Sequence, residues 1–310
     1  MNRFRWVTVC LAAGIGLAAW GQKMDLKVNY EPGVYTTTQT TITTSKTEGY
    51  GQSKKSAKRM VVVMERSVGQ ADAKGNREIA LTFRHAKSET LADDGSVTQT
   101  HDTATEPEST DPMIRAYRAV IGKPFIMTIH PTGFRIGNFK GQSEIAKAAK
   151  REDFLVGKVF GDLSNGIGHT TMLSWKPVDV GESWETLGEV LESVLWGKHV
   201  YTLKEVADGV AMATVKGTAT YEYDQWKEMM KNAPGGTILY TGPPLTITKA
   251  DGVADRAILI DVATGMITSI TSTVKSTSVV DDGMEKVTTV IDQQQEYTCT
   301  KGAYKAPKAE

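Results

Sequence analysis

The amino-acid sequence predicts an α+β fold that is rich in β-structure, with long antiparallel strands in a curved sheet packed on a few amphipathic helices. Runs of β-branched residues alternate with polar residues over much of the chain, which suits a pleated surface with one solvated face. Asp-Gly pairs separate several of these runs and favour tight hairpin turns. Capped segments with apolar residues at helical spacing interrupt the strands, and we expect these helices to cover the other face of the sheet.

The first strands are expected between residues 34 and 84. Residues 34–44 consist mainly of Thr, with Val, Tyr and Ile. Residues 60–65 and 78–84 flank a polar loop at 69–76, so they are expected to pair as antiparallel neighbours. The next hairpin turn is expected at residues 93–95, Asp-Asp-Gly, because Gly tolerates the positive φ of such turns.

Three helices are expected. Asp111 is a suitable N-cap, Pro112 suits the first helical position, and Gly122 suits the end. Between them, apolar residues recur at helical spacing: Met113, Ala116, Tyr117, Val120 and Ile121. A second helix is expected from Ser143 towards Gly161, and a third, shorter one at 224–232.

The second half of the chain is again predicted to consist of hairpins. Residues 199–203 and 210–215 surround Asp208-Gly209, and residues 257–261 and 266–270 flank Ala-Thr-Gly. A long strand then turns at 281–283 and returns over 285–298. Residues 301–310 have the composition of a loose tail.

A weak internal similarity leaves the domain organisation open. Residues 125–136 and 257–267 each contain an apolar strand, a turn centred on Thr-Gly and a returning strand, at an offset of 132 residues. This similarity is either a coincidence of hairpin chemistry or a duplication. Residues 22–300 therefore form either one domain or two similar halves, 22–165 and 166–300.

Residues 1–21 have the layout of a cleaved signal peptide. Two arginines precede an uncharged apolar run at 6–19, and Ala19-Trp20-Gly21 places small residues at positions −3 and −1 of a cut before Gln22. The run is shorter than the roughly 20 residues of a membrane-spanning helix. Cys10 lies inside the run instead of after it, so lipidation is not expected. The mature protein is therefore predicted to be exported, either periplasmic or secreted, without a membrane anchor.

The charge of the mature chain excludes some partners. Removing Arg3 and Arg5 from 36 basic residues leaves 34 against 36 acidic residues, a net charge near −2. A nucleic-acid binder needs a basic surface, and an anionic membrane attracts one. Neither is expected to be a partner. Cleavage also leaves Cys299 as the one thiol, so no internal disulfide is possible. Cys299 is expected to be a small strand residue that faces either the core or an edge of the sheet.

No catalytic or metal-binding motif is found in the sequence. The five histidines are at positions 85, 101, 130, 169 and 199. No two of them, and no histidine and cysteine, have the short sequence spacing that is typical of zinc ligands. Gly181-Glu182-Ser183 begins like a nucleophile elbow but lacks the second Gly. The sequence predicts no catalytic residues, no metal site and no cofactor.

Tryptophans give the one weak suggestion of a binding site. Together with nearby methionines, such residues either line an apolar pocket or belong to the core. The candidates for a hydrophobic ligand are Trp175, Trp184, Trp196 and Trp226. We expect any such pocket on the concave face of the curved sheet.

Residues 173–184 are distinctive, and Lys176 to Trp184 read Lys-Pro-Val-Asp-Val-Gly-Glu-Ser-Trp. This segment resembles one in exported bacterial proteins of the domain-of-unknown-function family 6263. Residues 122–133 and 255–265 are similar to two further elements of that family, with Leu-Ile-Asp at 259–261 where Phe-Asp is usual. The resemblance implies a secreted or envelope protein without an assigned activity and transfers no catalytic residues. In physical terms, residues 180–184 are expected to form a tight turn that places Trp184 in the core.

The sequence thus predicts an exported, non-enzymatic protein of the cell envelope that binds a hydrophobic ligand or an envelope protein partner. One alternative is a structural or interaction module that uses its Thr-rich strands as a protein-binding surface. Another is a hydrolase whose catalytic residues are scattered in the sequence. Nothing in the sequence indicates the oligomeric state.

Overall fold

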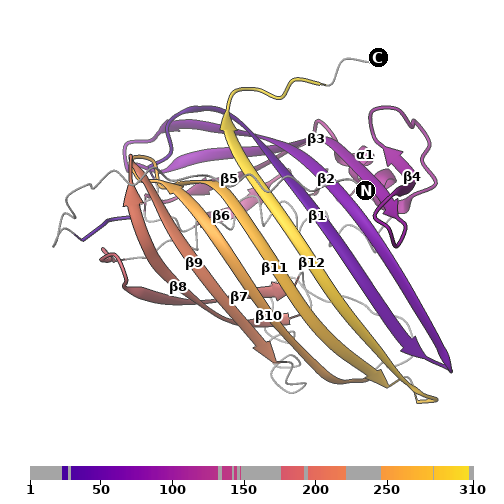
Figure 1. The fold of residues 1–310 in the computed structure, drawn as a ribbon. Coiled ribbons are helices and arrows are strands. Elements are labelled where there is room, and N and C mark those ends of the chain that lie inside the picture. The colour runs from indigo at the N-terminus through magenta and orange to yellow at the C-terminus, as the bar shows by residue number, and fades with distance from the viewer. Residues whose placement is uncertain are drawn as a thin grey trace.

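The computed structural model describes residues 23–26, 29–131, 135–141, 143–144, 147, 176–191, 195–220, 246–281 and 283–306. Within these residues the chain forms one antiparallel sheet of twelve strands, and one α-helix has both its start and its end among them (Figure 1). The elements are β1 (Gly33–Gly49), β2 (Gln52–Ala71), β3 (Arg77–Leu91), β4 (Val97–Asp102), α1 (Pro112–Val120), β5 (Pro124–Ile129), β6 (Arg135–Lys140), β7 (Ser183–Leu191), β8 (Leu195–Ala207), β9 (Val210–Thr220), β10 (Thr246–Asp261), β11 (Met266–Asp281) and β12 (Lys286–Lys301).

The two ends of the described chain meet at the centre of the sheet. The strand order is β6-β5-β3-β2-β1-β12-β11-β10-β9-β8-β7, and β4 pairs with β3 beside this path. β1 and β12 pair antiparallel from Tyr35 opposite Lys301 to Glu48 opposite Thr288. Both halves of the chain therefore contribute to one continuous sheet.

Local turn chemistry explains the hairpins, and the predicted strand pairs are confirmed. Asp208 and Gly209 have φ values of 51° and 77°, the positive values that a two-residue hairpin turn between β8 and β9 requires. Gly95 and Gly283 also have positive φ at the predicted turns. The predicted strands at 60–65 and 78–84 pair as β2 and β3.

The faces of the sheet differ in burial. On β1, Tyr35, Thr37, Gln39 and Thr41 are buried, whereas the alternate residues are only partly buried. Since successive side chains of a strand point to opposite faces, these four residues mark one face, here called the inner face. Most of its apolar residues form one core cluster that draws on both halves of the chain, including Phe83 and Leu203.

The predicted α+β class is wrong. The described residues are almost entirely in the sheet, and α1 is the one helix that lies among them from start to end. The prediction assumed that several helices cover the inner face. Instead, the sheet curls back on itself: β7 contacts β10 and β11, which lie three and four places from it in the strand order (Figure 1). The sheet thereby covers part of its own inner face.

α1 is the predicted helix that is confirmed. Asp111 caps it by accepting hydrogen bonds from the backbone N–H groups of Met113 (2.8 Å) and Ile114 (3.2 Å). Its buried face packs on β3, where the rings of Tyr117 and Phe83 lie edge to face at 5.2 Å. Of the predicted second helix only residues 143, 144 and 147 are described, as helical, and the third lies outside the described residues.

The turn at residues 179–182 has the predicted role. Glu182 N donates to Asp179 O at 2.9 Å, and Gly181 has a φ of 91°. Trp184 follows on β7 with 5% of its surface exposed, within the core cluster. The two segments of the proposed repeat both belong to hairpins, β5–β6 at one edge of the sheet and β10–β11 in its interior. The duplication stays a prediction.

Candidate functional site: a polar cavity on the inner face

The inner faces of β1, β2 and β12 border a cavity of about 270 Å³. On β1 and β2 the lining residues alternate along each strand, and the strand register sets them side by side: Gln39 opposite Val62, Thr41 opposite Met60, and Thr43 opposite Lys58. The described residues that line the cavity are Gln39, Thr41, Thr43, Ser45, Ser56, Lys58, Met60, Val62, Met113 and Gln293.

The lining changes character along the strands. At the inner end, Met60 and Val62 of β2 face Met113 of α1 and form an apolar patch next to the core. At the outer end, Ser56 and Lys58 are exposed, and the hydroxyl groups of Ser45 and Ser56 are hydrogen-bonded at 2.8 Å. The cavity is therefore amphipathic, with its polar end nearer to solvent.

Three buried polar side chains line the cavity without a hydrogen bond to any described residue. Gln39, Thr41 and Gln293 expose 4%, 8% and 8% of their surface. Their polar atoms are not among the fully buried atoms that lack a hydrogen-bond partner, so these atoms remain accessible from the space of the cavity. The hydrogen-bonding groups of these three residues are thus available to a molecule inside the cavity.

One ion pair stands at the edge of the cavity. Lys58 Nζ lies 2.8 Å from Asp111 Oδ2, and Ser88 Oγ donates to the same oxygen at 3.4 Å. Burial alone would raise the pKa of Asp111. The hydrogen bonds from Lys58 and from the backbone of Ile114 and Met113 outweigh that effect and lower the pKa. The carboxylate that caps α1 therefore also neutralises the cation in the cavity wall.

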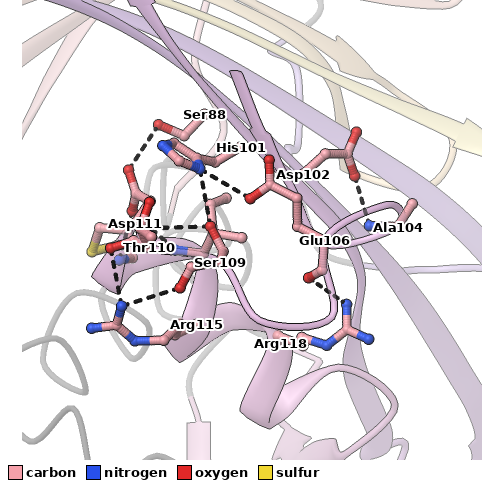
Figure 2. A network of polar contacts seen from close by, with 12 residues as sticks. Ser88, His101, Asp102, Ala104, Glu106, Ser109, Thr110, Asp111, Arg115 and Arg118 are labelled. Carbon is pink, nitrogen blue, oxygen red and sulfur yellow. Dashed lines mark hydrogen bonds and ion pairs between the residues drawn. The ribbon is translucent and has the colours of Figure 1, made fainter. Parts of the chain in front are cut away.

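A second polar network lies beyond Asp111 and holds residues 101–118 together (Figure 2). His101 Nδ1 lies 2.9 Å from Glu106 Oε2 and 3.1 Å from Ser109 Oγ. Hydrogen bonds from His101 and Ser109 lower the pKa of Glu106. Arg118 donates to the carbonyl oxygen of Thr103 at 2.6 Å, and Arg115 donates to that of Ser109 at 3.1 Å. These contacts fasten the loop before α1 to the helix.

The Ser109, His101 and Glu106 cluster is not arranged as a catalytic triad. In a triad the serine and the acid contact different nitrogens of the histidine, so that the ring can pass a proton between them. Here both contact Nδ1, and Ser109 is only 4% exposed. The cluster is suited to holding the loop and not to activating Ser109.

Arg66 forms the centre of another buried cluster, on β2. Its guanidinium lies 5.7 Å from the centroid of the Tyr30 ring, and it donates to the Tyr297 hydroxyl at 3.5 Å. Burial raises the pKa of Tyr297 and that of the Cys299 thiol. Cys299 is 6% exposed, with Sγ 3.6 Å from the sulfur of Met266. The predicted strand cysteine is confirmed and faces the core, and the protonated thiol is unsuited to nucleophilic chemistry.

The predicted tryptophan site is not assembled by the described residues. Trp184 is stacked on Tyr201 at 5.3 Å in the core and is not part of the cavity lining. Trp196 lies on β8, and nothing is described of its side chain. Trp175 and Trp226 lie outside the described residues.

The described residues contain no group of three or more His, Cys, Asp or Glu side chains that could hold a metal ion. In the same part of the chain, no helix is both long and apolar enough to span a membrane.

Comparison with known proteins does not assign a family. No family model matches the chain, and no curated protein matches it either. The resemblance to family 6263 therefore stays a prediction.

Some solved structures are similar over most of their length. DynF from the dynemicin biosynthesis pathway of Micromonospora chersina is 9% identical, with 93% of this chain and 88% of that chain covered and a TM-score of 0.22. The CymD monoaromatic hydrocarbon channel is 9% identical, with coverages of 88% and 90% and a TM-score of 0.20. Ail, the attachment invasion locus protein of Yersinia pestis, crystallised with the heparin analogue sucrose octasulfate, is 7% identical, with coverages of 86% and 99% and a TM-score of 0.14. At TM-scores this low, none of them supports an inference about this chain.

None of the described cavity-lining residues was predicted from the sequence as a binding residue. The available signal was the run of polar residues at 37, 39, 41 and 43, all on one face of β1. The alternate positions 36, 38, 40 and 44 are also Thr, so alternation alone does not reveal which set is buried.

Proposed function

We propose that this protein is an exported, non-enzymatic binding protein that takes a small amphipathic ligand in the inner-face cavity. The observation that carries the proposal is the set of largely buried polar side chains at Gln39, Thr41 and Gln293, whose polar atoms are accessible from the cavity and make no hydrogen bond to the described residues. Binding sites for small molecules commonly combine an apolar surface with a few convergent polar groups, and Met60 and Met113 supply the apolar surface here. The polar lining therefore favours a ligand with a polar end over the purely hydrophobic ligand expected from the sequence.

Two observations support a binding role over a hydrolytic one. The Ser109 cluster has its serine and its acid on the same histidine nitrogen, which prevents the proton relay of a hydrolase. The cavity lining contains amides, hydroxyls and one paired lysine, none of which is an activated nucleophile.

The binding site can be tested by filling the cavity. Thr41→Phe places a ring among the unpartnered side chains, whereas Thr40→Phe places the same ring on the outer face of the same strand. After expression in a bacterial host that exports the chain, native mass spectrometry should detect one co-purified molecule on the wild-type protein and on Thr40→Phe. We expect Thr41→Phe to lose it. The proposal would be contradicted if Thr41→Phe, still folded by circular dichroism, retained the bound mass, or if the wild-type protein carried none and gained none from a host extract.

Export is tested by the mass of the mature protein. We expect the chain recovered from the periplasm or medium to begin at Gln22, because small residues precede that position and the apolar run ends before it. Intact-mass analysis of the recovered protein measures the cut directly. A chain that keeps residues 1–21, or that stays in the cytoplasmic fraction, would contradict the export proposal.

A protein partner is the second candidate function, and a groove on the outer face favours it. This groove, of about 590 Å³, runs over β8 to β12 and contains Lys216, Asp255, Thr271, Thr273 and Glu296. Cross-linking in envelope fractions distinguishes the two functions. Thr271→Arg should abolish the cross-link to a partner that binds the groove, and it should leave ligand binding in the inner-face cavity unchanged.

A further inference from the structure

We infer that the ligand of the inner-face cavity carries an uncharged, hydrogen-bonding head group, and that Asp111 enforces this selection by neutralising Lys58. The inference rests on the proposed function and adds to it the chemical class of the ligand. It follows from the charges in and around the lining and from the way Asp111 is held.

Among the described lining residues, the polar groups that remain available are neutral. Gln39 and Gln293 offer amide donors and acceptors, and Thr41 offers a hydroxyl that both donates and accepts. Hydroxyl and carboxamide groups complement such a set. An ionised head group placed beside Gln39, Thr41 and Gln293, which are at most 8% exposed, would lose hydration there without meeting an opposite charge among the described lining residues, and that transfer is costly.

Lys58 is the one cation among the described lining residues, and its ammonium group is paired with Asp111. The ion pair measures 2.8 Å, and the side chain of Asp111 is only 6% exposed. Asp111 cannot turn away to release Lys58 without also breaking its hydrogen bonds to the backbone N–H groups of Met113 and Ile114. The cation is therefore held in its pair by the start of α1.

The polar groups are spread along the strands. Gln293 of β12 lies opposite Thr43, which is four residues from Gln39 on β1. At a rise of roughly 3.3 Å per residue, the Cα atoms of Gln39 and Gln293 are separated by about 13 Å along the strand direction. The apolar patch of Met60, Val62 and Met113 accompanies this strip. A ligand with several neutral polar groups and one apolar portion fits this arrangement.

Methionine methyl groups provide a direct reading of occupancy. Met60 and Met113 line the cavity, whereas Met64 is fully buried in the core and Met284 is 87% exposed. In protein labelled with ¹³C at the methionine methyls, a ligand in the cavity should shift the first two resonances and leave the other two in place. Four probes with the same hexyl or hexanoyl chain differ in head group: hexyl glucoside, hexanamide, hexyl sulfate and hexyltrimethylammonium.

We expect at least one of the two neutral probes to shift the Met60 and Met113 resonances with an affinity about tenfold or more above both charged probes. The stronger of the two neutral probes then identifies a hydroxyl or an amide as the head group. Tightest binding by hexyl sulfate or hexyltrimethylammonium would overturn the inference and leave the cavity as a binding site. No shift of Met60 and Met113 with any probe would overturn both the cavity as a site and the inference.

The role of Asp111 is tested by Asp111→Asn, because Asn caps a helix about as well as Asp but does not neutralise Lys58. This variant should gain about tenfold or more in affinity for hexyl sulfate, since a charge-assisted hydrogen bond from Lys58 becomes available. Lys58→Gln, which removes the cation, should show no such gain. Equal affinities of the wild-type protein and Asp111→Asn for hexyl sulfate would refute the role of Asp111.

Discussion

Phe83→Ala is expected to lower the free energy of unfolding by about 3–5 kcal/mol, the usual range for removing a buried aromatic ring. Phe83 is 1% exposed, and its ring lies 5.2 Å from that of Tyr117 on α1. The substitution leaves a cavity between β3 and the helix and removes an aromatic pair. Urea unfolding followed by circular dichroism measures the loss.

Thr82→Ala is the matched control, since Thr82 precedes Phe83 on β3 and is only partly buried. We expect this change to stay within about 0.5 kcal/mol of the wild-type stability, as for most surface substitutions. Phe83→Leu should fall between the two. Similar losses for Phe83→Ala and Thr82→Ala would mean that the ring does not hold α1 on the sheet.

Asp111→Ala is expected to cost about 2 kcal/mol, because it removes the cap of α1 and the partner of Lys58 together. Asp111→Asn keeps a capping side chain and should lose less. The same urea unfolding at pH 7 gives both values. A loss for Asp111→Ala no larger than that for Asp111→Asn would show that capping contributes nothing at this site.

The charge of Asp111 also makes a pH-dependent contribution to stability. Its pKa is lowered in the folded state, so the folded protein binds a proton there less readily than the unfolded chain does. The contribution is therefore complete above the unfolded pKa, near 4, and is lost as the pH falls through the folded value. We expect the stability difference between the wild-type protein and Asp111→Asn to be largest at pH 7 and to shrink at pH 3.5. A constant difference across that range would exclude the ion pair as its cause.

The sequence predicted those parts of the fold that depend on neighbouring residues. The hairpin at Asp208-Gly209 follows from backbone conformations that few other residue pairs adopt. The start of α1 follows in the same way from Asp111 and Pro112. Both features are encoded within a few positions, so a single sequence suffices to find them.

The pairing at the centre of the sheet and the residues of the cavity could not be predicted in this way. The sheet is continuous because β1 pairs with β12, at the opposite end of the described chain, and no local pattern indicates that pairing. The cavity depends on which face of β1 is buried, and Thr occupies both faces, with Thr41 inside and Thr40 outside. Gln39 and Gln293 become neighbours of one cavity only after the two central strands have paired.

The pairing of β1 with β12 has a consequence for the order in which the molecule can be made. The hydroxyl of Thr36 donates to the carbonyl oxygen of Gly302, a contact that spans 266 positions. A chain that emerges N-terminus first, from a ribosome or through a translocation pore, presents β1 with one of its two neighbours missing until the last strand follows. Because long-range strand pairing is slow and costs chain entropy, the centre of the sheet is completed last. The centre of the sheet can therefore form only once the last strand is available to pair with the first.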